Sequence, residues 1–303
     1  MRATAYYGRE AEVKLIGMIP VRNEDWCLGF TLRVALRWCD EVMVFLHACT
    51  DRSQEIAVSI AREHNPRVSV HAHDGEQWDE MKHRQTLLEL ARRRGATHLA
   101  MIDADEFLTA DLTDAHGVPI RLLVNRLEPG QLLDLPGYNL REQLTTWAYH
   151  SNGVWGNRWF STAFPDSPGA CWGGDQFHHR EPMGVAWRRV RPVAQGDAGT
   201  LHLWGASERR LRAKHALYKI TERLRWPDKP AAVIERYYGQ ATTPRELWTF
   251  RAVPTRWLDT YQDYMQYLQI AAEPWQVAEV KRLVEQYGYE KFIGLDLLGV
   301  PEW

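Results

Sequence analysis

The sequence predicts an α/β fold: a Rossmann-like N-terminal parallel sheet, then an α+β half and C-terminal helices. Three observations support this. Apolar segments alternate with amphipathic helices through the first hundred residues, the helices run for about ten to fifteen residues, and capping or turn residues separate the segments. Strands that alternate with helices pair in parallel through right-handed crossovers. The expected strands are 13–20, 41–46, 67–71 and 98–102.

The helices of this first half have recognisable ends. A helix over 26–38 follows the first strand, and a second carries Ile56 and Ile60 at helical spacing. Asp51 with Gln54 three residues later resembles a capping box for this second helix. The third, 80–94, ends at a glycine, which is a favourable helix-terminating residue.

The regular alternation ends after the fourth strand. We expect residues 1–110 to form the α/β half, residues 111–206 to form an α+β half of the same domain with long loops, and residues 207–303 to form a helical extension. The last helix should begin at Pro274 and end at Gly288.

Composition excludes several classes of protein. The 303 residues are 45% hydrophobic and 25% charged, which is typical of a globular chain. Four cysteines lack the spacing of a zinc site, so we expect free thiols. The N-terminus lacks the apolar core of a signal peptide and no run of about 18 apolar residues occurs, so a cytoplasmic protein is expected. The 14 tryptophans suit either core packing or stacking on sugars and bases.

Charge is unevenly distributed along the chain. The net charge is -2, yet residues 187–256 hold 15 Lys and Arg against 6 Asp and Glu. Basic side chains near an acidic site suit a diphosphate ligand, and an excess of them also suits a polyanion such as nucleic acid. A solvated, salt-bridged helical surface is the alternative interpretation of the same charges.

The segment 98–108 is the most informative in the chain, because an apolar strand ends there in Asp103, Asp105 and Glu106. The carboxyl ends of parallel strands are where open α/β sheets bind ligands, and carboxylates suit hard cations. The segment therefore predicts a site for a metal ion and a diphosphate. The alternative is an acidic cap on the following turn.

Several features in order resemble the family 2-like glycosyltransferases of GT-A fold. They are the segment 20–24 after the first strand, Thr50 with Asp51, the helix that carries Arg84, and the acidic string from Asp103. Their order and separation match over about the first 110 residues. The resemblance implies a nucleotide-diphosphate sugar donor, a divalent cation and transfer to an acceptor hydroxyl with inversion at the anomeric carbon.

The resemblance also implies the metal ligands. Asp105 would bind the cation directly, and Asp103 would contact the donor ribose or a water on the metal. His202, in a strand-like segment before a helix, would be the third protein ligand. Imidazole suits Mn²⁺ better than Mg²⁺, and either is the expected cofactor. A hydrogen-bonded structural role is the alternative for His202.

The remaining donor-binding residues follow from the same resemblance. The segment after the first strand would line the nucleotide pocket, and Arg84 would reach the diphosphate or base. Lys214 and Lys219 would neutralise the leaving diphosphate. One departure concerns the second strand, where Leu46 stands in place of the acid that reads the base, and His47 would substitute for it. The donor-binding candidates are Pro20, Arg22, Asn23, Glu24, His47, Arg84, Asp103, Lys214 and Lys219.

Transfer to a hydroxyl also needs a general base. Asp175 is the first candidate because two glycines and several polar residues surround it in the sequence, although it also fits a simple turn. Glu181 and His178 are the other candidates.

The acceptor is less determined than the donor. We expect a glycan or a lipid-linked sugar, with a hydroxymethylated base in DNA as an alternative that would have to be flipped out of the helix. A nucleotidyltransferase would share the fold, but the segment 20–24 lacks a glycine-rich phosphate loop. A non-catalytic module that binds a nucleotide-sugar or nucleic acid is the remaining alternative. No integral membrane segment is expected, and the oligomeric state is not predicted.

Overall fold

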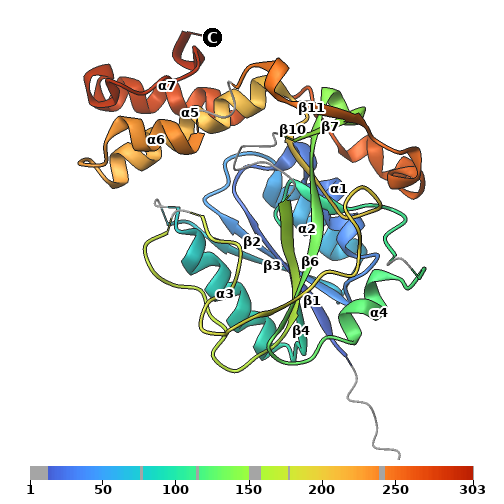
Figure 1. Ribbon diagram of the computed structural model, residues 1–303. Helices are drawn as coiled ribbons and strands as arrows, with labels where there is room; N and C mark the ends of the chain where they lie inside the picture. The colour runs from blue at the N-terminus through green and yellow to red at the C-terminus, as the bar shows by residue number, and fades with distance from the viewer. Residues whose placement is uncertain are drawn as a thin grey trace, which may run out of the picture.

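The computed structural model describes residues 13–75, 78–113, 116–149, 158–176, 178–238 and 243–302. Figure 1 shows a central mixed sheet with helices on both faces and a further group of helices beyond one end of the strands. Across the sheet the strands follow the order β11-β7-β6-β8-β4-β1-β2-β3, and β5, β9 and β10 attach beside this path.

The first half matches the predicted alternation of strands and helices. β1 pairs in parallel with β2 and β4, and β2 pairs in parallel with β3, so the predicted parallel sheet is confirmed. The elements in chain order are β1 (Leu15–Val21), α1 (Asp25–Ala35), β2 (Glu41–His47), α2 (Ser53–Glu63), β3 (Val68–His73), α3 (Glu80–Arg93) and β4 (His98–Met101).

One local prediction in this half is wrong. Helix α2 begins at Ser53, and Asp51 accepts a hydrogen bond from the Ser53 amide at 2.9 Å instead of capping the helix through Gln54. Asp51 also accepts from the Asp25 amide at 3.0 Å, so it joins the starts of α1 and α2.

The middle of the chain extends the sheet with mainly antiparallel strands. β8 lies between β4 and β6 and is antiparallel to both, whereas β10 is parallel to β6 and antiparallel to β5. The elements are β5 (Glu106–Leu108), α4 (Ile120–Asn125), β6 (Gln131–Arg141), η1 (Glu142–Leu144), β7 (Thr146–Tyr149), β8 (Arg158–Pro165), β9 (Arg188–Val190) and β10 (Thr200–Gly205).

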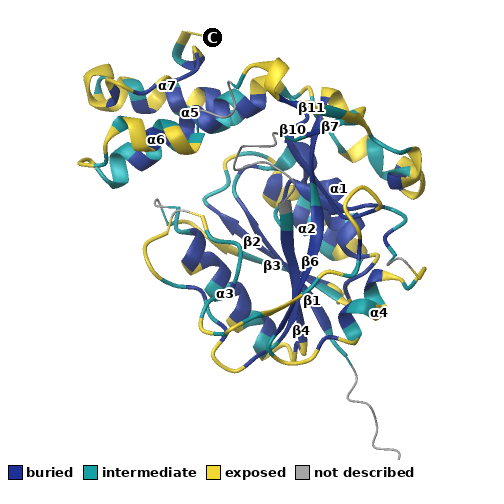
Figure 2. Cartoon of the chain, in the orientation of Figure 1, coloured by how far each residue is buried: buried dark blue, intermediate teal, exposed yellow. Residues whose placement is uncertain are grey.

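Alternation along β1 distributes its side chains to the two faces of the sheet. Leu15, Ile19 and Val21 pack with α1 and α2, whereas Ile16 and Met18 pack with α3. Both sets are buried, as expected for a parallel sheet covered by helices on each face. Figure 2 shows the central strands mostly buried, whereas most of the surrounding helices carry both buried and exposed residues.

The C-terminal segment is only partly the predicted helical extension. It contains α5 (Glu208–Arg225), α6 (Ala231–Tyr238) and α7 (Trp275–Tyr287), which share an apolar core, and α7 has the predicted ends at Pro274 and Gly288. However, β11 (Thr249–Ala252) pairs with β7 and adds a strand to the sheet. The short 3-10 helices are η3 (Arg245–Leu247), η4 (Thr255–Trp257), η5 (Asp259–Tyr267), η6 (Tyr289–Phe292) and η7 (Val300–Glu302).

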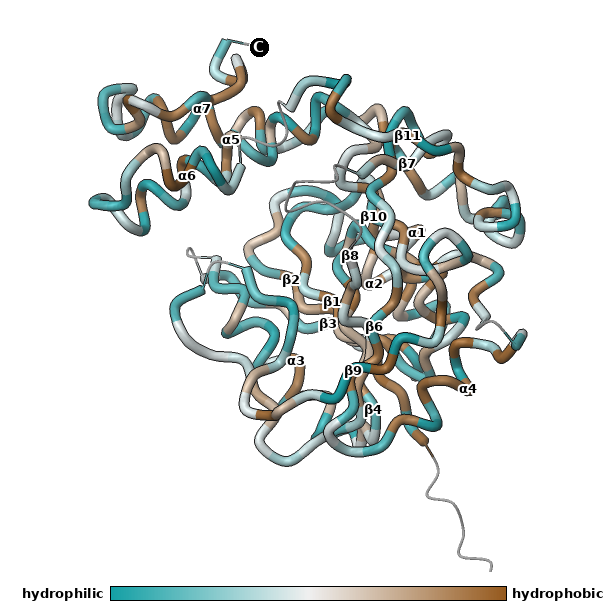
Figure 3. Tube along the Cα trace, in the orientation of Figure 1, coloured by the Kyte–Doolittle hydropathy of each residue, from teal (hydrophilic) through white to brown (hydrophobic). Residues whose placement is uncertain are grey.

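Helix α5 crosses the region beyond the carboxyl ends of β1 and β4 (Figure 1). It begins directly after β10, where the Ser207 hydroxyl caps it by accepting from the Arg210 amide. Figure 3 shows apolar and polar segments alternating along α5 and α7, which fits helices that pack on one side and face a cavity or solvent on the other. The described part of the chain contains no helix long and apolar enough to cross a membrane.

Candidate active site

A cavity of about 840 Å³ lies between the carboxyl ends of β1 and β4 and the helices α5 and α7. Its volume is in the range of sites that hold a nucleotide-sized ligand. The wall contains ten of the residues expected from the sequence: Pro20, Arg22, Glu24, Arg84, Asp103, Asp105, His178, Glu181, His202 and Lys214.

Hydrogen bonds to backbone carbonyls hold the acidic segment 103–106 at the edge of this cavity. The Ala104 carbonyl accepts from the Thr31 hydroxyl of α1 at 2.7 Å, and the Asp105 carbonyl accepts from the Leu203 amide of β10 at 2.8 Å. β5 and β10 pair with Glu106 opposite His202. This register explains how residues about a hundred positions apart in the sequence meet at one site.

Asp105 is largely enclosed, and its side chain is 8% exposed. Its Oδ2 accepts from Lys214 Nζ at 2.8 Å and lies 3.5 Å from His202 Nε2. Burial alone would raise the pKa of this carboxyl, but the charges of Lys214 and His202 outweigh burial and hold the pKa below its usual value. Asp105 is therefore ionised.

His202 is oriented by a second hydrogen bond. Its Nδ1 lies 3.0 Å from Asn139 Oδ1 on the neighbouring strand β6. In a neutral, metal-binding form of the ring, Nδ1 would donate its proton to this amide oxygen, and Nε2, which faces Asp105, would be the ligand atom. An outer partner of this kind fixes the ring of a metal-ligating histidine in many proteins.

Asp103 lies between two arginines. Its Oδ1 accepts from Arg84 at 2.6 Å and its Oδ2 from Arg180 at 3.1 Å. Burial opposes ionisation, but the charges of Arg84 and Arg180 hold the pKa of Asp103 below its usual value. Arg180 also donates to Glu106 at 2.5 Å, so these side chains form one hydrogen-bonded network.

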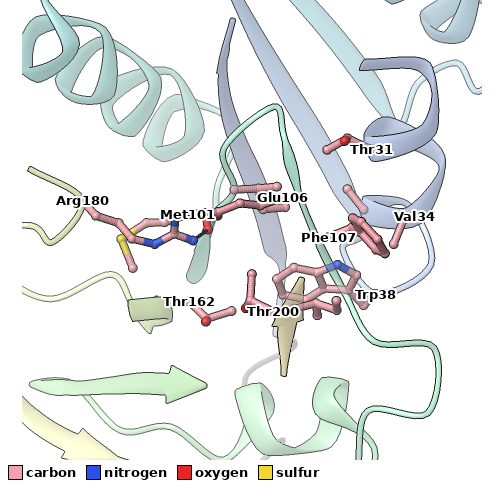
Figure 4. Close-up of a pocket in the computed structure, with 12 residues that line it drawn as sticks. Thr31, Val34, Trp38, Met101, Glu106, Phe107, Thr162, Arg180 and Thr200 are labelled. Carbon is pink, nitrogen blue, oxygen red and sulfur yellow. Dashed lines mark hydrogen bonds and ion pairs between the residues drawn. The ribbon is translucent and has the colours of Figure 1, made fainter. Parts of the chain in front are cut away.

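Arg180 and Glu106 also border a second, much smaller space of about 10 Å³ beneath the network. Figure 4 shows them beside it, together with Thr162 and Thr200. This volume is close to the minimum that holds one water molecule. The Thr200 hydroxyl, which is buried without a hydrogen-bond partner among the described residues, would be satisfied by such a water.

The donor atoms of the site fit a divalent cation with two protein ligands. Asp105 Oδ2 and His202 Nε2 are close enough for both to lie about 2.1 Å from one ion, and Lys214 Nζ shows that a cation is accommodated beside Asp105. Among the described residues, no group of three or more His, Cys, Asp and Glu side chains could hold a metal. The other ligands would therefore have to come from substrate oxygens and water, which is common for Mg²⁺ at phosphate sites.

Glu24 has a strongly shifted pKa. It lines the cavity at the end of β1, and its carboxylate accepts from Trp26 Nε1 at 2.5 Å. Burial raises the pKa of Glu24 to about 7, against the opposing charge of Lys214 and with a further increase from Asp105. The side chain is therefore partly protonated near neutral pH.

The shift at Glu24 predicts a pH-dependent change in stability. The folded pKa lies above the ordinary value of 4.5, so ionisation favours the unfolded chain, and the penalty grows as the pH rises from 4.5 to about 7. We expect Glu24→Gln, which cannot ionise, to become more stable relative to wild type across this interval and to keep a constant advantage above it. Denaturant unfolding of both proteins between pH 5 and pH 8 measures this difference. A difference that does not change with pH would contradict the assignment.

His178, whose side chain is 38% exposed, pairs with the buried Glu80 at the cavity wall. His178 Nδ1 lies 2.6 Å from Glu80 Oε2, and the Glu80 side chain is 8% exposed. Glu80 also accepts from Arg84 at 2.8 Å. Burial opposes ionisation of Glu80, but Arg84 and His178 outweigh it and hold the pKa below its usual value. The ionised carboxylate therefore fixes the ring of His178 at the cavity.

Four predicted residues do not line the cavity, and their expected roles need correction. Asn23 is buried and uses its side-chain oxygen to accept from the Thr50 amide at 2.7 Å, which shapes the loop. His47 is buried against Trp78 and His83. Lys219 is fully buried in the helical layer, where it donates to Glu235 at 2.8 Å and to a backbone carbonyl.

Asp175 is the fourth of these residues and was the first candidate for the base. Its side chain is 74% exposed, and it accepts from Arg225 and from the Trp226 indole, which the sequence 172–175 does not reveal. Glu181 does line the cavity, but its carboxylate pairs with Arg189 at 2.5 Å. His178 is therefore the candidate that the geometry favours.

Sequence reasoning also missed residues that belong to the site. Glu80 and Arg84 are four residues apart on one helix, and this spacing in the sequence is typical of an ion pair. Arg180 stands in the same polar segment of the sequence as the predicted bases Asp175, His178 and Glu181. Nothing in the sequence indicated that α7 reaches the cavity, to which it contributes Trp275, Gln276, Glu279, Arg282, Leu283 and Tyr287.

Comparisons with known proteins give partial structural likenesses. The crystal structure of S. aureus TarS 1-349 matches over 96% of this chain and 90% of that chain, at 13% identity and a TM-score of 0.41. The crystal structure of M. tuberculosis glucosyl-3-phosphoglycerate synthase matches over 32% of this chain and only 36% of that chain, at 14% identity and a TM-score of 0.27. A complex of that enzyme with Mn²⁺, uridine-diphosphate-glucose and phosphoglyceric acid gives the same TM-score of 0.27.

No family model and no curated protein matches the sequence. These TM-scores lie below 0.5, so the likenesses assign no function to this chain.

Proposed function

We propose that the protein is a glycosyltransferase that moves a sugar from a nucleotide-diphosphate donor to an acceptor hydroxyl, with inversion and with the help of a divalent cation. One observation carries the proposal. Asp105 and His202 meet at the carboxyl edge of a parallel sheet, in a cavity that Arg84, Arg180 and Lys214 also line. Carboxylate and imidazole beside several cations suit a diphosphate that binds together with a metal ion.

The end of β1 would hold the nucleotide part of the donor. Arg22 lies over the Trp275 ring, 5.5 Å from its centre. Arg22 Nε, Trp275 Nε1 and Gln276 Oε1 are buried at the wall without hydrogen-bond partners among the described residues. Unsatisfied polar atoms of this kind call for a ligand or water, and a base or ribose offers both donors and acceptors.

Asp105 and His202 would hold Mn²⁺ or Mg²⁺, and Asp103 would face the ribose or a metal-bound water. When bound, the cation would supply Lewis-acid stabilisation of the departing diphosphate. Lys214 and Arg84 would add positive charge on the same side of the cavity. Because the site is enclosed, these charges would act more strongly than in water.

His178 would serve as the general base. The acceptor oxygen forms a bond to the anomeric carbon, the bond from that carbon to the diphosphate oxygen breaks, and the acceptor proton moves to His178. Glu80 would hold the ring and stabilise the imidazolium that results, since its ionised carboxylate contacts Nδ1 at 2.6 Å. Attack opposite the leaving group inverts the anomeric centre.

The acceptor side supports a glycan or a lipid-linked sugar. Aromatic side chains stand in this wall beside apolar residues of α5 and α7, and such rings stack on sugar faces and on apolar groups. They are Trp159, Phe160, Trp204, Tyr218, Tyr238 and Tyr287. A modified base in DNA would also stack on such rings, so DNA that contains hydroxymethylated bases belongs among the acceptors to be tested.

The proposal is tested by a donor screen. Purified protein is incubated with UDP-, GDP-, CDP- and ADP-sugars with Mn²⁺, with Mg²⁺ or with EDTA, and release of the nucleoside diphosphate is measured before and after acceptors are added. We expect one donor class to be cleaved only with a cation, and faster once its acceptor is present. Failure of every donor to bind or to be cleaved would overturn the proposed function.

A further inference from the structure

Lys214 occupies the position beside Asp105 where a bound cation would be needed. Its Nζ lies 2.8 Å from Asp105 Oδ2, the same oxygen that lies 3.5 Å from His202 Nε2. The Lys214 side chain is 16% exposed, so this ion pair is largely shielded from solvent. A metal ion on Asp105 and the ammonium group at this position would therefore compete for one carboxylate oxygen.

The backbone that carries Lys214 is fixed, so the competition concerns the side chain alone. Lys214 stands in the second turn of α5, whose neighbouring residues Leu211, Ala213 and Ala216 are completely buried. The guanidinium of Arg210 packs over the Trp26 ring at 4.1 Å and further anchors this end of the helix. Four rotatable side-chain bonds let the ammonium group move while the helix stays in place.

We propose that Lys214 is a built-in counter-ion of Asp105, which keeps a divalent cation off the carboxylate until a nucleoside diphosphate arrives and takes over the ammonium group. The inference rests on the proposed function, because it assigns to Lys214 two successive partners within that site. Lys214 is thereby a positioning residue that makes the cation and the diphosphate bind together.

Charge balance gives the physical reason. In the present arrangement Lys214 neutralises Asp105 in an enclosed site, and a divalent cation added beside it would meet a like charge at short range. A diphosphate brings negative charge of its own, so it can accept both the cation and the ammonium group. Glu24, another acid that acts on Lys214, is itself partly protonated near pH 7 and is a weaker alternative partner for the lysine.

The test measures metal binding directly, without turnover. Mn²⁺ is titrated into wild type, Lys214→Met and Lys214→Gln, and free Mn²⁺ is followed by electron paramagnetic resonance, first alone and then with saturating UDP or GDP. Lys291→Met, which removes one exposed lysine, is the matched control. Circular dichroism and thermal unfolding verify that each variant is folded. If Lys214→Met does not fold, Lys214→Gln, which keeps a hydrogen-bonding group, still provides the test.

We expect wild type and Lys291→Met to bind Mn²⁺ weakly alone and at least tenfold more tightly with the diphosphate. In Lys214→Met and Lys214→Gln, Mn²⁺ alone should bind at least tenfold more tightly than in wild type, and the diphosphate should add little. Introducing Asp105→Asn into either variant should remove the gain. If neither Lys214 variant binds Mn²⁺ more tightly than wild type, the inference is overturned.

The outcomes separate this inference from the proposed function. Tighter Mn²⁺ binding in the Lys214 variants, without binding of UDP, GDP, CDP or ADP to wild type, supports the counter-ion role of Lys214 but contradicts both its release by a diphosphate and the nucleotide-sugar donor. Diphosphate binding to wild type, without tighter Mn²⁺ binding in the variants, supports the donor and contradicts the counter-ion.

Discussion

Replacement of Asp105 by asparagine is expected to lower cation-dependent transfer by about 10³-fold or more, since it removes the charged ligand from the centre of the site. His202→Ala should have an effect in the same direction. The measurement is initial velocity with the donor identified by the screen, over a range of Mn²⁺ concentrations. If Asp105 acts through the cation, excess Mn²⁺ should restore part of the activity of His202→Ala but little of the activity of Asp105→Asn.

The same substitution also tests the buried ion pair. Asp105→Asn leaves Lys214 charged and without its carboxylate partner, and breaking a buried pair from one side costs about 3 kcal/mol of unfolding free energy. The double variant Asp105→Asn with Lys214→Gln should recover most of this loss, because neither charge remains. Full transfer activity in a folded Asp105→Asn protein would contradict the assigned metal site.

Replacement of His178 by glutamine is expected to lower kcat by roughly 10² to 10⁴-fold, the usual contribution of a general base. Donor binding, measured by calorimetry with the nucleoside diphosphate, should stay close to that of wild type. Glutamine can still bond to Glu80, so an effect on kcat alone separates proton transfer from a purely structural role.

Two further variants sharpen this prediction. Asp175→Asn, which alters an exposed side chain outside the cavity, should leave kcat within about twofold of wild type, as expected for a surface substitution. Glu80→Gln should also lower kcat, because the carboxylate that holds the His178 ring through Nδ1 at 2.6 Å would be lost. Unchanged turnover in His178→Gln would contradict the base assignment.

The sequence predicted the first half of the fold well because its signals are local. Apolar strands, amphipathic helices and glycine or proline boundaries determine β1 to β4 and α1 to α3 within a few residues. The same local signals predicted that Asp103 and Asp105 lie at the edge of the sheet where the parallel strands end. For the C-terminal segment the pairing of β11 with β7 joins positions about a hundred residues apart, which no local pattern reveals.

A site residue could be predicted where its sequence context allows few roles. It could not be predicted where its role depends on which side chains it meets in the folded chain. Asp105 and His202 lie together at the cavity. The strand context indicated the acids, whereas His202 was implied by the resemblance to glycosyltransferases of GT-A fold. Asp175 and Lys219 have the right chemistry but find other partners, Arg225 and Glu235, through tertiary packing. Neither partner stands near its residue in the sequence, so only the folded chain distinguishes these residues from Lys214.

The pairing of β11 with β7 has a consequence for how the specificity of this protein can change. The chain leaves the sheet through α5, returns to it at β11 and leaves again toward α7, so each of the two helices in the wall of the cavity follows a strand of the sheet, α5 after β10 and α7 after β11. The segment from α5 to α7 therefore cannot be replaced as one unit without removing β11 from the sheet. New acceptor preferences are therefore accessible chiefly by changing individual side chains on α5 and α7, with Tyr218 and Tyr287 as the natural first positions for a library.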